Sequence, residues 1–151
     1  MEEIKPLTED TLDEAVELII NSFDSVHGKG HFEDGWVKME LSAQFSSGPY
    51  FPNYYYVFKD GVMVAVAGYA KSLFADNTYE LRLAATHPDF MKQGHLTRLL
   101  NYRIDEIKEK LKGKDGLIIM DTYRPEIYYK HGFELMKSSE DFNIMMMEIK
   151  K

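Results

Sequence analysis

Hydrophobic residues recur along this chain with two different periods, and these periods predict where helices and strands lie. Apolar side chains repeat at helical spacing between Leu12 and Phe23. A longer amphipathic pattern follows Pro88, extends to Leu111 and is ended by Gly113. Each of these patterns predicts a helix that buries one face against the rest of the protein.

Alternating apolar and polar positions predict the strands of a sheet. The dipeptide Asp60-Gly61 separates residues 54–59 from an alternating run that ends at Val66, which is a strong signal for a β-hairpin. Residues 79–86 alternate in the same way. Further elements are expected at 3–6 (strand), 33–45 (helix), 117–120 (buried strand), 125–132 (short helix), 133–136 and 142–149 (strands). This order predicts an α/β fold in a single domain that spans residues 1–151.

The composition excludes several classes of protein. Of 151 residues, 44% are hydrophobic and none is cysteine, so a packed core is available but a disulfide framework, a thiolate metal site and a cysteine nucleophile are not. The net charge of −7 argues against a nucleic-acid backbone as the main partner. No signal-peptide pattern and no stretch of roughly 20 apolar residues is present, so a cytoplasmic location without membrane contact is expected.

The histidines offer an alternative chemistry. His27 and His31 are spaced by four, as metal ligands on a helix can be, but Gly28 and Gly30 lie between them and no nearby set of carboxylates completes a motif. We therefore predict no metal site. Hydrolase, nucleotide-triphosphatase and dehydrogenase interpretations lose support, because the chain has no Gly-x-Ser-x-Gly elbow, no Walker loop and no Gly-x-Gly-x-x-Gly motif.

The most informative stretch is the turn between the strand at 79–86 and the long helix, from Met91 to Thr97. Such a turn brings backbone N–H groups and the positive end of the helix dipole together, which suits a phosphate. Gly94 has no side chain, so a phosphate can approach the main chain there. His95 either faces that phosphate or, as is commoner for histidine, is exposed to solvent. A glycine in such a turn is not specific by itself.

A second motif makes this turn more informative. Tyr128, Gly132 and Phe133 form the pattern Tyr-x-x-x-Gly-Phe after the buried strand. Together with the lead-in at residues 86–90, this pattern resembles that of the GNAT superfamily of acetyltransferases. The resemblance spans residues 54–150, and the N-terminal strand and helix fit the same fold.

The phosphate loop departs from the family pattern at two positions. The family carries Arg or Gln, two variable residues, Gly, one variable residue, then Gly or Ala. Here Gly94 keeps the middle position, while Met91 and Leu96 replace the outer two. Met91 removes a side-chain donor but leaves the main-chain N–H groups. Leu96 either adds bulk beside the pyrophosphate or turns into the core with Leu99 and Leu100.

The resemblance implies a fold and a co-substrate. The fold is a mixed, mostly antiparallel central sheet, splayed near Ala84, with helices on both faces. The co-substrate is acetyl-coenzyme A, which donates acetyl to a primary amine of a small molecule or peptide by direct attack in a ternary complex. A homodimer is compatible with the resemblance. The implied coenzyme A contacts are Ala84, Ala85, Thr86, Met91, Lys92, Gln93, Gly94, His95, Leu96 and Thr97.

The resemblance also suggests two catalytic residues. Glu80 occupies the register of a glutamate that some family members use as a general base through water, because an alkylamine with a pKa of about 10.4 must lose a proton before attack. Its other interpretation is an outward-facing carboxylate that opposes Arg82. Tyr128 is the candidate general acid for the coenzyme A thiolate. Its other interpretation is a core aromatic residue.

The acceptor is not determined by the sequence. Aromatic residues such as Trp36, Tyr50 and Tyr56 are candidates for binding an amine through cation–π contacts, although core packing explains such residues equally well. Two other functions stay open. Met91 and Leu96 favour a non-catalytic module that binds or senses acyl-coenzyme A, and the aromatic region at 32–56 is compatible with a protein-interaction domain.

Overall fold

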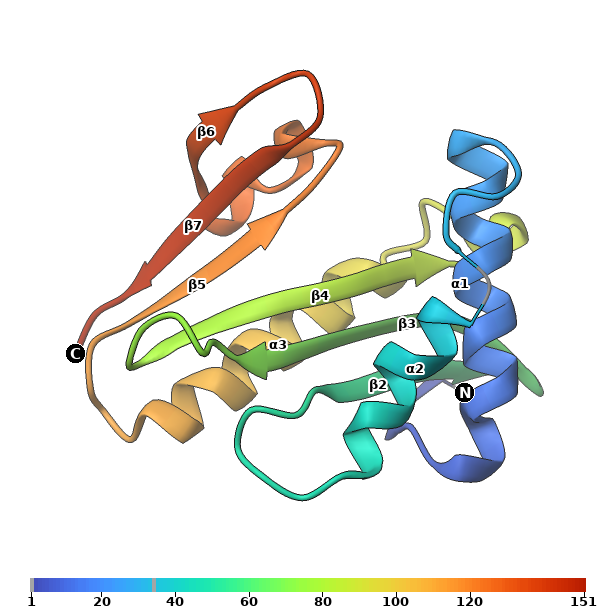
Figure 1. Ribbon diagram of the computed structural model, residues 1–151, viewed down its shortest axis with the longest axis horizontal. Coiled ribbons are helices and arrows are strands. Elements are labelled where there is room, and N and C mark those ends of the chain that lie inside the picture. Colours follow the sequence, from blue (N-terminus) through green and yellow to red (C-terminus); the bar gives the residue numbers. More distant parts are fainter. Residues whose placement is uncertain (1, 34) are drawn as a thin grey trace.

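Seven strands form one sheet in the order β1-β2-β3-β4-β5-β7-β6 (Figure 1). This computed structural model describes residues 2–33 and 35–151. The β4–β5 pair is parallel and the other pairs are antiparallel, so the sheet is mixed and mostly antiparallel as predicted. The strands are β1 Glu2–Pro6, β2 Asn53–Lys59, β3 Val62–Lys71, β4 Thr78–Thr86, β5 Gly116–Asp121, β6 Glu134–Ser138 and β7 Asn143–Ile149.

Three α-helices cover the sheet, with α1 (Leu12–His27) and α2 (Trp36–Ser42) on one face and α3 (His95–Leu111) on the other (Figure 1). The helix expected at 33–45 is shorter, because Gly35 adopts a left-handed conformation (φ 82°) at its N-terminal cap. The short helix expected at 125–132 consists instead of two 3₁₀ turns, Pro125–Ile127 and Tyr129–His131.

Each face of the sheet has its own apolar core. On the first face, α1 and α2 pack Leu18, Ile19 and Leu41 against Val66 of β3. On the second face, α3 packs its apolar stripe mainly against β3 and β4, as its period predicted, and Ile118 of β5 and Met145 of β7 join the same core. No helix in the described part of the chain is long and apolar enough to cross a membrane.

The sheet splays between β4 and β5. The parallel pairing covers Thr78–Glu80 of β4, and beyond Glu80 this strand is paired only with β3. In that second half Ala84 pairs with Ala67 while Arg82 pairs with the next residue of β3, so Leu83 is an extra residue in β4. Such a bulge bends the strand and redirects its side chains. The splay predicted near Ala84 is therefore present, with its bulge one residue earlier.

A buried arginine of α3 supports this bulge. Arg103 is 1% exposed. Its Nη1 donates to the carbonyl oxygen of Gly68 at 3.0 Å and to that of Arg82 at 3.5 Å, and its Nε donates to the Leu99 carbonyl at 3.2 Å. Burial lowers the pKa of Arg103 to about 10, so the guanidinium stays charged at neutral pH. One cation therefore holds the carbonyl groups of the paired residues Gly68 and Arg82, next to the extra residue.

Candidate active site

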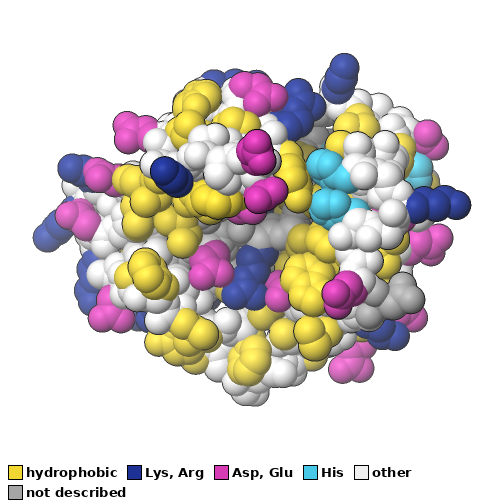
Figure 2. All heavy atoms as spheres, turned by 45° about the horizontal axis from the view of Figure 1, so that its top comes forward, with side chains coloured by type: hydrophobic (Ala, Val, Ile, Leu, Met, Phe, Trp, Pro, Cys, Tyr) yellow, Lys and Arg dark blue, Asp and Glu magenta, His cyan; other side chains and the backbone are white. Residues whose placement is uncertain are grey.

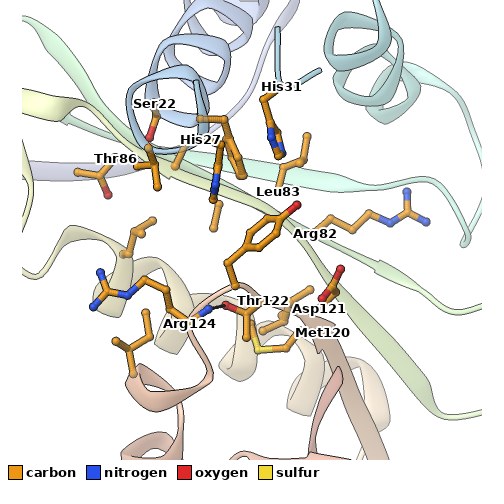
Figure 3. A pocket seen from close by; sticks show the side chains of 18 of the residues that line it. Ser22, His27, His31, Arg82, Leu83, Thr86, Met120, Asp121, Thr122 and Arg124 are labelled. Atoms are coloured by element: carbon orange, nitrogen blue, oxygen red, sulfur yellow. Dashed lines mark hydrogen bonds between the residues drawn. The ribbon is translucent and has the colours of Figure 1, made fainter. Parts of the chain in front are cut away.

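The splay opens a cavity of about 550 Å³ that lies between the two halves of the sheet. Its walls come from residues 81–86 of β4, residues 120–124 at the end of β5 and beyond, the C-terminal part of α1, and the start of α2 (Figure 3). Figure 2 shows it as a hollow with acidic and basic side chains at its floor and histidine and apolar side chains on its rim. A cavity of this size suits a small ligand and the reactive end of a co-substrate.

One end of the cavity leads to the N-terminus of α3. The backbone there turns through left-handed conformations at Lys92 (φ 62°) and Gly94 (φ 86°). The Arg98 N–H donates to the Gly94 carbonyl at 3.1 Å, so the N–H groups of the preceding turn have no acceptor within the helix. A Cβ atom at Gly94 would meet no described atom within 4 Å. This combination of open space, N–H groups and helix dipole fits a pyrophosphate.

The implied coenzyme A contacts divide into two groups. Ala84, Ala85, Thr86, Met91 and Leu96 line the cavity itself. The other five residues lie beside the cavity wall, in the loop before α3 and in the first turn of this helix. They are Lys92, Gln93, Gly94, His95 and Thr97.

Leu96 and His95 differ in burial at the start of α3. Leu96 is partly buried, because it packs beside Leu99 against the cluster that contains Val57 and Val64 while it also lines the cavity. The expected exposure of His95 is wrong, because this side chain is 2% exposed. Its Nδ1 lies 2.8 Å from Nη2 of Arg98, and burial lowers the pKa of the imidazole.

Four polar side chains form a connected group at the opposite end of the cavity. Arg82 donates through Nη1 to Glu40 at 3.0 Å, and through Nε and Nη2 to Glu80 at 3.3 Å. The Tyr54 hydroxyl donates to the second Glu40 oxygen at 2.6 Å. Burial and then the Glu40 charge raise the pKa of Tyr54 well above its usual value. Glu40 and Arg82 line the cavity, whereas Glu80 lies behind Arg82.

Tyr128 lies between the two 3₁₀ turns and lines the cavity. Its ring packs edge-on against Phe133 with centroids 5.9 Å apart, so the motif Tyr-x-x-x-Gly-Phe has a packing role as well. Burial raises the pKa of Tyr128, and the charge of Arg103 partly opposes this increase. The phenol is therefore protonated at neutral pH and lies in the cavity wall.

Of the three predicted acceptor residues, only Trp36 lines the cavity. Tyr56 is buried in the core at 7% exposure. Tyr50 is exposed in the loop before β2, with Nζ of Lys71 5.6 Å from its ring centroid. Sequence reasoning assigned no site role to several residues that do line the cavity, namely His27, His31, Glu40, Arg103 and Tyr123. Tyr123 could have been predicted as a site residue, because it comes just after the buried strand. Glu40 and Arg103 lie within helical patterns, and nothing in those patterns marks them as site residues.

The described residues contain no group of three or more His, Asp or Glu side chains placed to hold a metal ion. His27 and His31 do lie close together, but their rings are stacked on one another at 4.6 Å between centroids. Ring stacking therefore accounts for the spacing that suggested metal ligands.

No protein-family model and no curated protein matches this sequence. Solved structures do match over the full chain. A GNAT-family acetyltransferase from Staphylococcus aureus has a TM-score of 0.81 at 13% identity, covering 99% of this chain and 100% of that one. This chain has the fold of the GNAT acetyltransferases.

Other proteins with the GNAT fold connect it to coenzyme A and to amines. The PaiA N-acetyltransferase from Thermoplasma acidophilum, solved in complex with coenzyme A, has a TM-score of 0.74 at 17% identity and covers 99% of both chains. The ribosomal-protein-S18-alanine N-acetyltransferase from Escherichia coli has a TM-score of 0.72 at 19% identity, covering 100% of this chain and 96% of its own. At these identities the likeness concerns the fold.

Proposed function

We propose that this chain is an acetyl-coenzyme A-dependent N-acetyltransferase that acts on a primary amine by direct attack in a ternary complex. The observation that carries the proposal is one continuous cavity that runs from the splay of β4 and β5 to Met91 and Leu96, next to the N-terminus of α3. A co-substrate with a pyrophosphate at one end and a thioester at the other matches that layout. The structural neighbour solved with coenzyme A supports the same assignment.

The co-substrate supplies an activated acetyl group as a thioester. The chain supplies the anion site at residues 91–97, where main-chain N–H groups and the helix dipole act on the pyrophosphate. The backbone edge of Ala84–Thr86 has no strand beside it on the cavity side, so its N–H and C=O groups are available to a pantetheine arm and to the thioester oxygen.

Two side chains handle protons in this proposal. The amine must lose a proton before it attacks, and Glu80 is the base that accepts it. Because Glu80 lies behind Arg82 rather than on the cavity wall, a water molecule has to carry the proton between them. Tyr128 lines the cavity and is protonated at neutral pH, so it can donate a proton to the departing thiolate.

The competing proposal is a module that binds acyl-coenzyme A without turnover. Met91 and Leu96 were the reasons for it. Against it, Leu96 is partly buried beside Leu99, and the space over Gly94 is open, which supports room for a pyrophosphate at the main chain. The position of Tyr128 in the cavity wall favours the enzyme, because a binding module needs no proton donor there.

The test uses two glycines at opposite ends of α3. Gly94 and Gly113 both have a left-handed backbone (φ 86° and 79°), and a Cβ at either meets no described atom within 4 Å. Gly94→Glu and Gly113→Glu therefore carry a similar backbone cost of about 1 kcal/mol. Only the first introduces bulk and negative charge at the pyrophosphate. Calorimetry with coenzyme A should show at least about a hundredfold weaker binding for Gly94→Glu and parental binding for Gly113→Glu.

Equal binding of coenzyme A by the parent and a folded Gly94→Glu variant would contradict the position of the site. Binding without release of free coenzyme A from acetyl-coenzyme A, across polyamines, amino acids, aminoglycosides and peptide N-termini, would favour the non-catalytic module. Release that depends on the added amine supports the enzyme.

A further inference from the structure

A continuous row of aromatic rings crosses the cavity. Successive ring centroids are 5.2 Å apart from Trp36 to Phe32, 4.7 Å from Phe32 to His31, 4.6 Å from His31 to His27 and 4.4 Å from His27 to Tyr123. All five residues line the cavity. We name this set the aromatic row. Phe23, which packs at the edge of the first core cluster, contacts the rings of Phe32, His31 and His27, so the core supports one end of the row, whereas Tyr123 is 56% exposed.

The row connects the two sides of the splay. His27 and His31 come from the end of α1 and the loop after it, and they point into the cavity (Figure 3). Thr122 and Arg124 come from the opposite side, where the chain leaves β5 (Figure 3), and Tyr123 lies between them in the sequence. The contact between His27 and Tyr123 therefore closes over the cavity between these two segments. An extended peptide cannot lie across this contact without separating the rings.

The remaining space restricts the size of the acceptor. The cavity measures about 550 Å³ and has to hold the acetyl end of the co-substrate as well as the amine. The wall that the acceptor meets consists of ring faces and edges, which pack best against a flat apolar group and also attract an ammonium through cation–π contacts.

The charges of the cavity restrict the chemistry of the acceptor. Two arginines of the wall are bound within the protein, Arg82 to Glu40 and Glu80 and Arg103 to carbonyl groups, whereas Arg124 donates to Glu126 through Nε alone. A carboxylate placed beside Arg82 would lie next to the negative charge of Glu40. The group of Arg82 and its two glutamates carries a net negative charge, so this end of the cavity favours a cationic amine.

We propose that the acceptor is a small primary amine carried on a flat apolar body without an acidic group, and that the aromatic row excludes peptides. This inference rests on the proposed function. In the reaction the amine nitrogen forms a bond to the acetyl carbon, the carbon–sulfur bond breaks, the nitrogen loses one proton and the coenzyme A sulfur gains one.

Binding can be measured directly, because Trp36 is the only tryptophan of the chain and lies in the row. Three probes share one ring: 2-phenylethylamine, phenylalanine, which adds a carboxylate, and a hexapeptide that begins with phenylalanine. Titration of Trp36 fluorescence should give at least about tenfold tighter binding of 2-phenylethylamine than of the other two. The kcat/KM for acetylation should follow the same order. Weaker or equal binding of 2-phenylethylamine would overturn the inference.

Tyr123 is the residue to change, and Tyr129 is its matched control. Both tyrosines are exposed, at 56% and 50%, so neither substitution should unfold the protein, but Tyr129 does not line the cavity. Tyr123→Ala should lose the preference for 2-phenylethylamine over the hexapeptide by about tenfold, whereas Tyr129→Ala and Tyr123→Phe should keep it. If Tyr123→Ala kept the preference for 2-phenylethylamine over the hexapeptide, the aromatic row would not be what excludes peptides from the cavity.

The two levels of the proposal fail in different experiments. If coenzyme A does not bind, the proposed function fails, while the fluorescence titration still reports whether the cavity selects the amine. If coenzyme A binds and 2-phenylethylamine binds without being acetylated, or the hexapeptide is the better substrate, the proposed acceptor class is wrong and the acetyltransferase assignment is untouched.

Discussion

The two halves of β4 share the partner β3 and differ on their other edge. Residues 78–80 are also paired with β5, so their backbone groups are satisfied within the sheet. Residues 82–86 have the bulge at Leu83 and turn their other edge to the cavity. The first half of β4 is therefore paired on both edges, whereas the second half leaves the backbone groups of one edge available to a ligand. The site therefore depends on where strand pairing stops more than on any one side chain.

Arg103 is the residue that maintains this difference, and changing it should have the largest effect. Arg103→Met keeps much of the side-chain length but leaves the Gly68 and Arg82 carbonyls without their buried donor. We expect the free energy of unfolding to fall by about 3 kcal/mol, because unsatisfied buried groups cost about 1 to 3 kcal/mol each. Coenzyme A affinity should fall as well, since the bulge would relax. Urea unfolding and calorimetry measure the two effects.

Lys108→Met on the same helix is the control for Arg103→Met. Lys108 is exposed, so its loss should change stability by less than about 0.5 kcal/mol. If Arg103→Met were as stable as the parent and bound coenzyme A equally well, the two halves of β4 would not depend on this arginine.

Most of the fold follows from local pattern. The hairpin at Asp60-Gly61, the strand that became β4 and the stripe of α3 were all predictable, because period and turn chemistry act within a few residues. The splay came only from the resemblance. The splay accompanies the extra residue Leu83 in β4 and the contacts of Arg103 beside it. One extra residue does not change the alternation of β4 enough to be seen in the sequence.

The sequence predicted the parts of the site that the backbone forms. It did not predict the parts that tertiary packing brings together. Gly94 marked the anion turn because only a few backbone conformations bring N–H groups together there. Tyr56 was a plausible pocket residue, but strand alternation buries it in the core. His95 lies at the start of α3 with its side chain buried, although a histidine next to a glycine suggested exposure. The aromatic row joins residues about 90 positions apart, which no local pattern reveals.

Glu80 is the last β4 residue that is paired with β5. Its substitution tests whether the side chain at this position takes part in catalysis. Glu80→Gln should lower turnover by a factor of about 10² and leave coenzyme A affinity unchanged, as expected for loss of a general base. Glu40→Gln is the comparison, because Glu40 also binds Arg82 but is anchored by Tyr54. An unchanged rate and pH profile in Glu80→Gln would leave Glu80 only as a partner of Arg82.

Tyr128 faces the open half of β4 across the cavity, and its hydroxyl should have a moderate effect. Tyr128→Phe keeps the edge-on packing against Phe133, so stability should stay within about 1 kcal/mol of the parent. Turnover should fall by about tenfold to a hundredfold, because a coenzyme A thiolate is already a fair leaving group. Equal turnover by the variant, with a folded protein, would make water or another hydroxyl the proton source.

The smallest effect is expected on the α3 face of the sheet, where Tyr55 of β2 and Tyr69 of β3 both donate to Glu106 of α3. Burial, and for Tyr55 then the bond to Glu106, raise the pKa of both phenols. A phenol whose pKa is raised on folding contributes stability that is complete below its unfolded pKa of about 10 and is lost as pH rises through the folded value.

Tyr55→Phe should therefore cost about 1 kcal/mol at pH 7, since Tyr55 is half-buried and its bond is to a charged group. Urea unfolding should show this difference shrinking above about pH 10, while coenzyme A affinity stays parental at pH 7. A difference that grows with pH, or a loss of coenzyme A binding at pH 7, would mean that the closed part of the sheet and the open half of β4 are coupled.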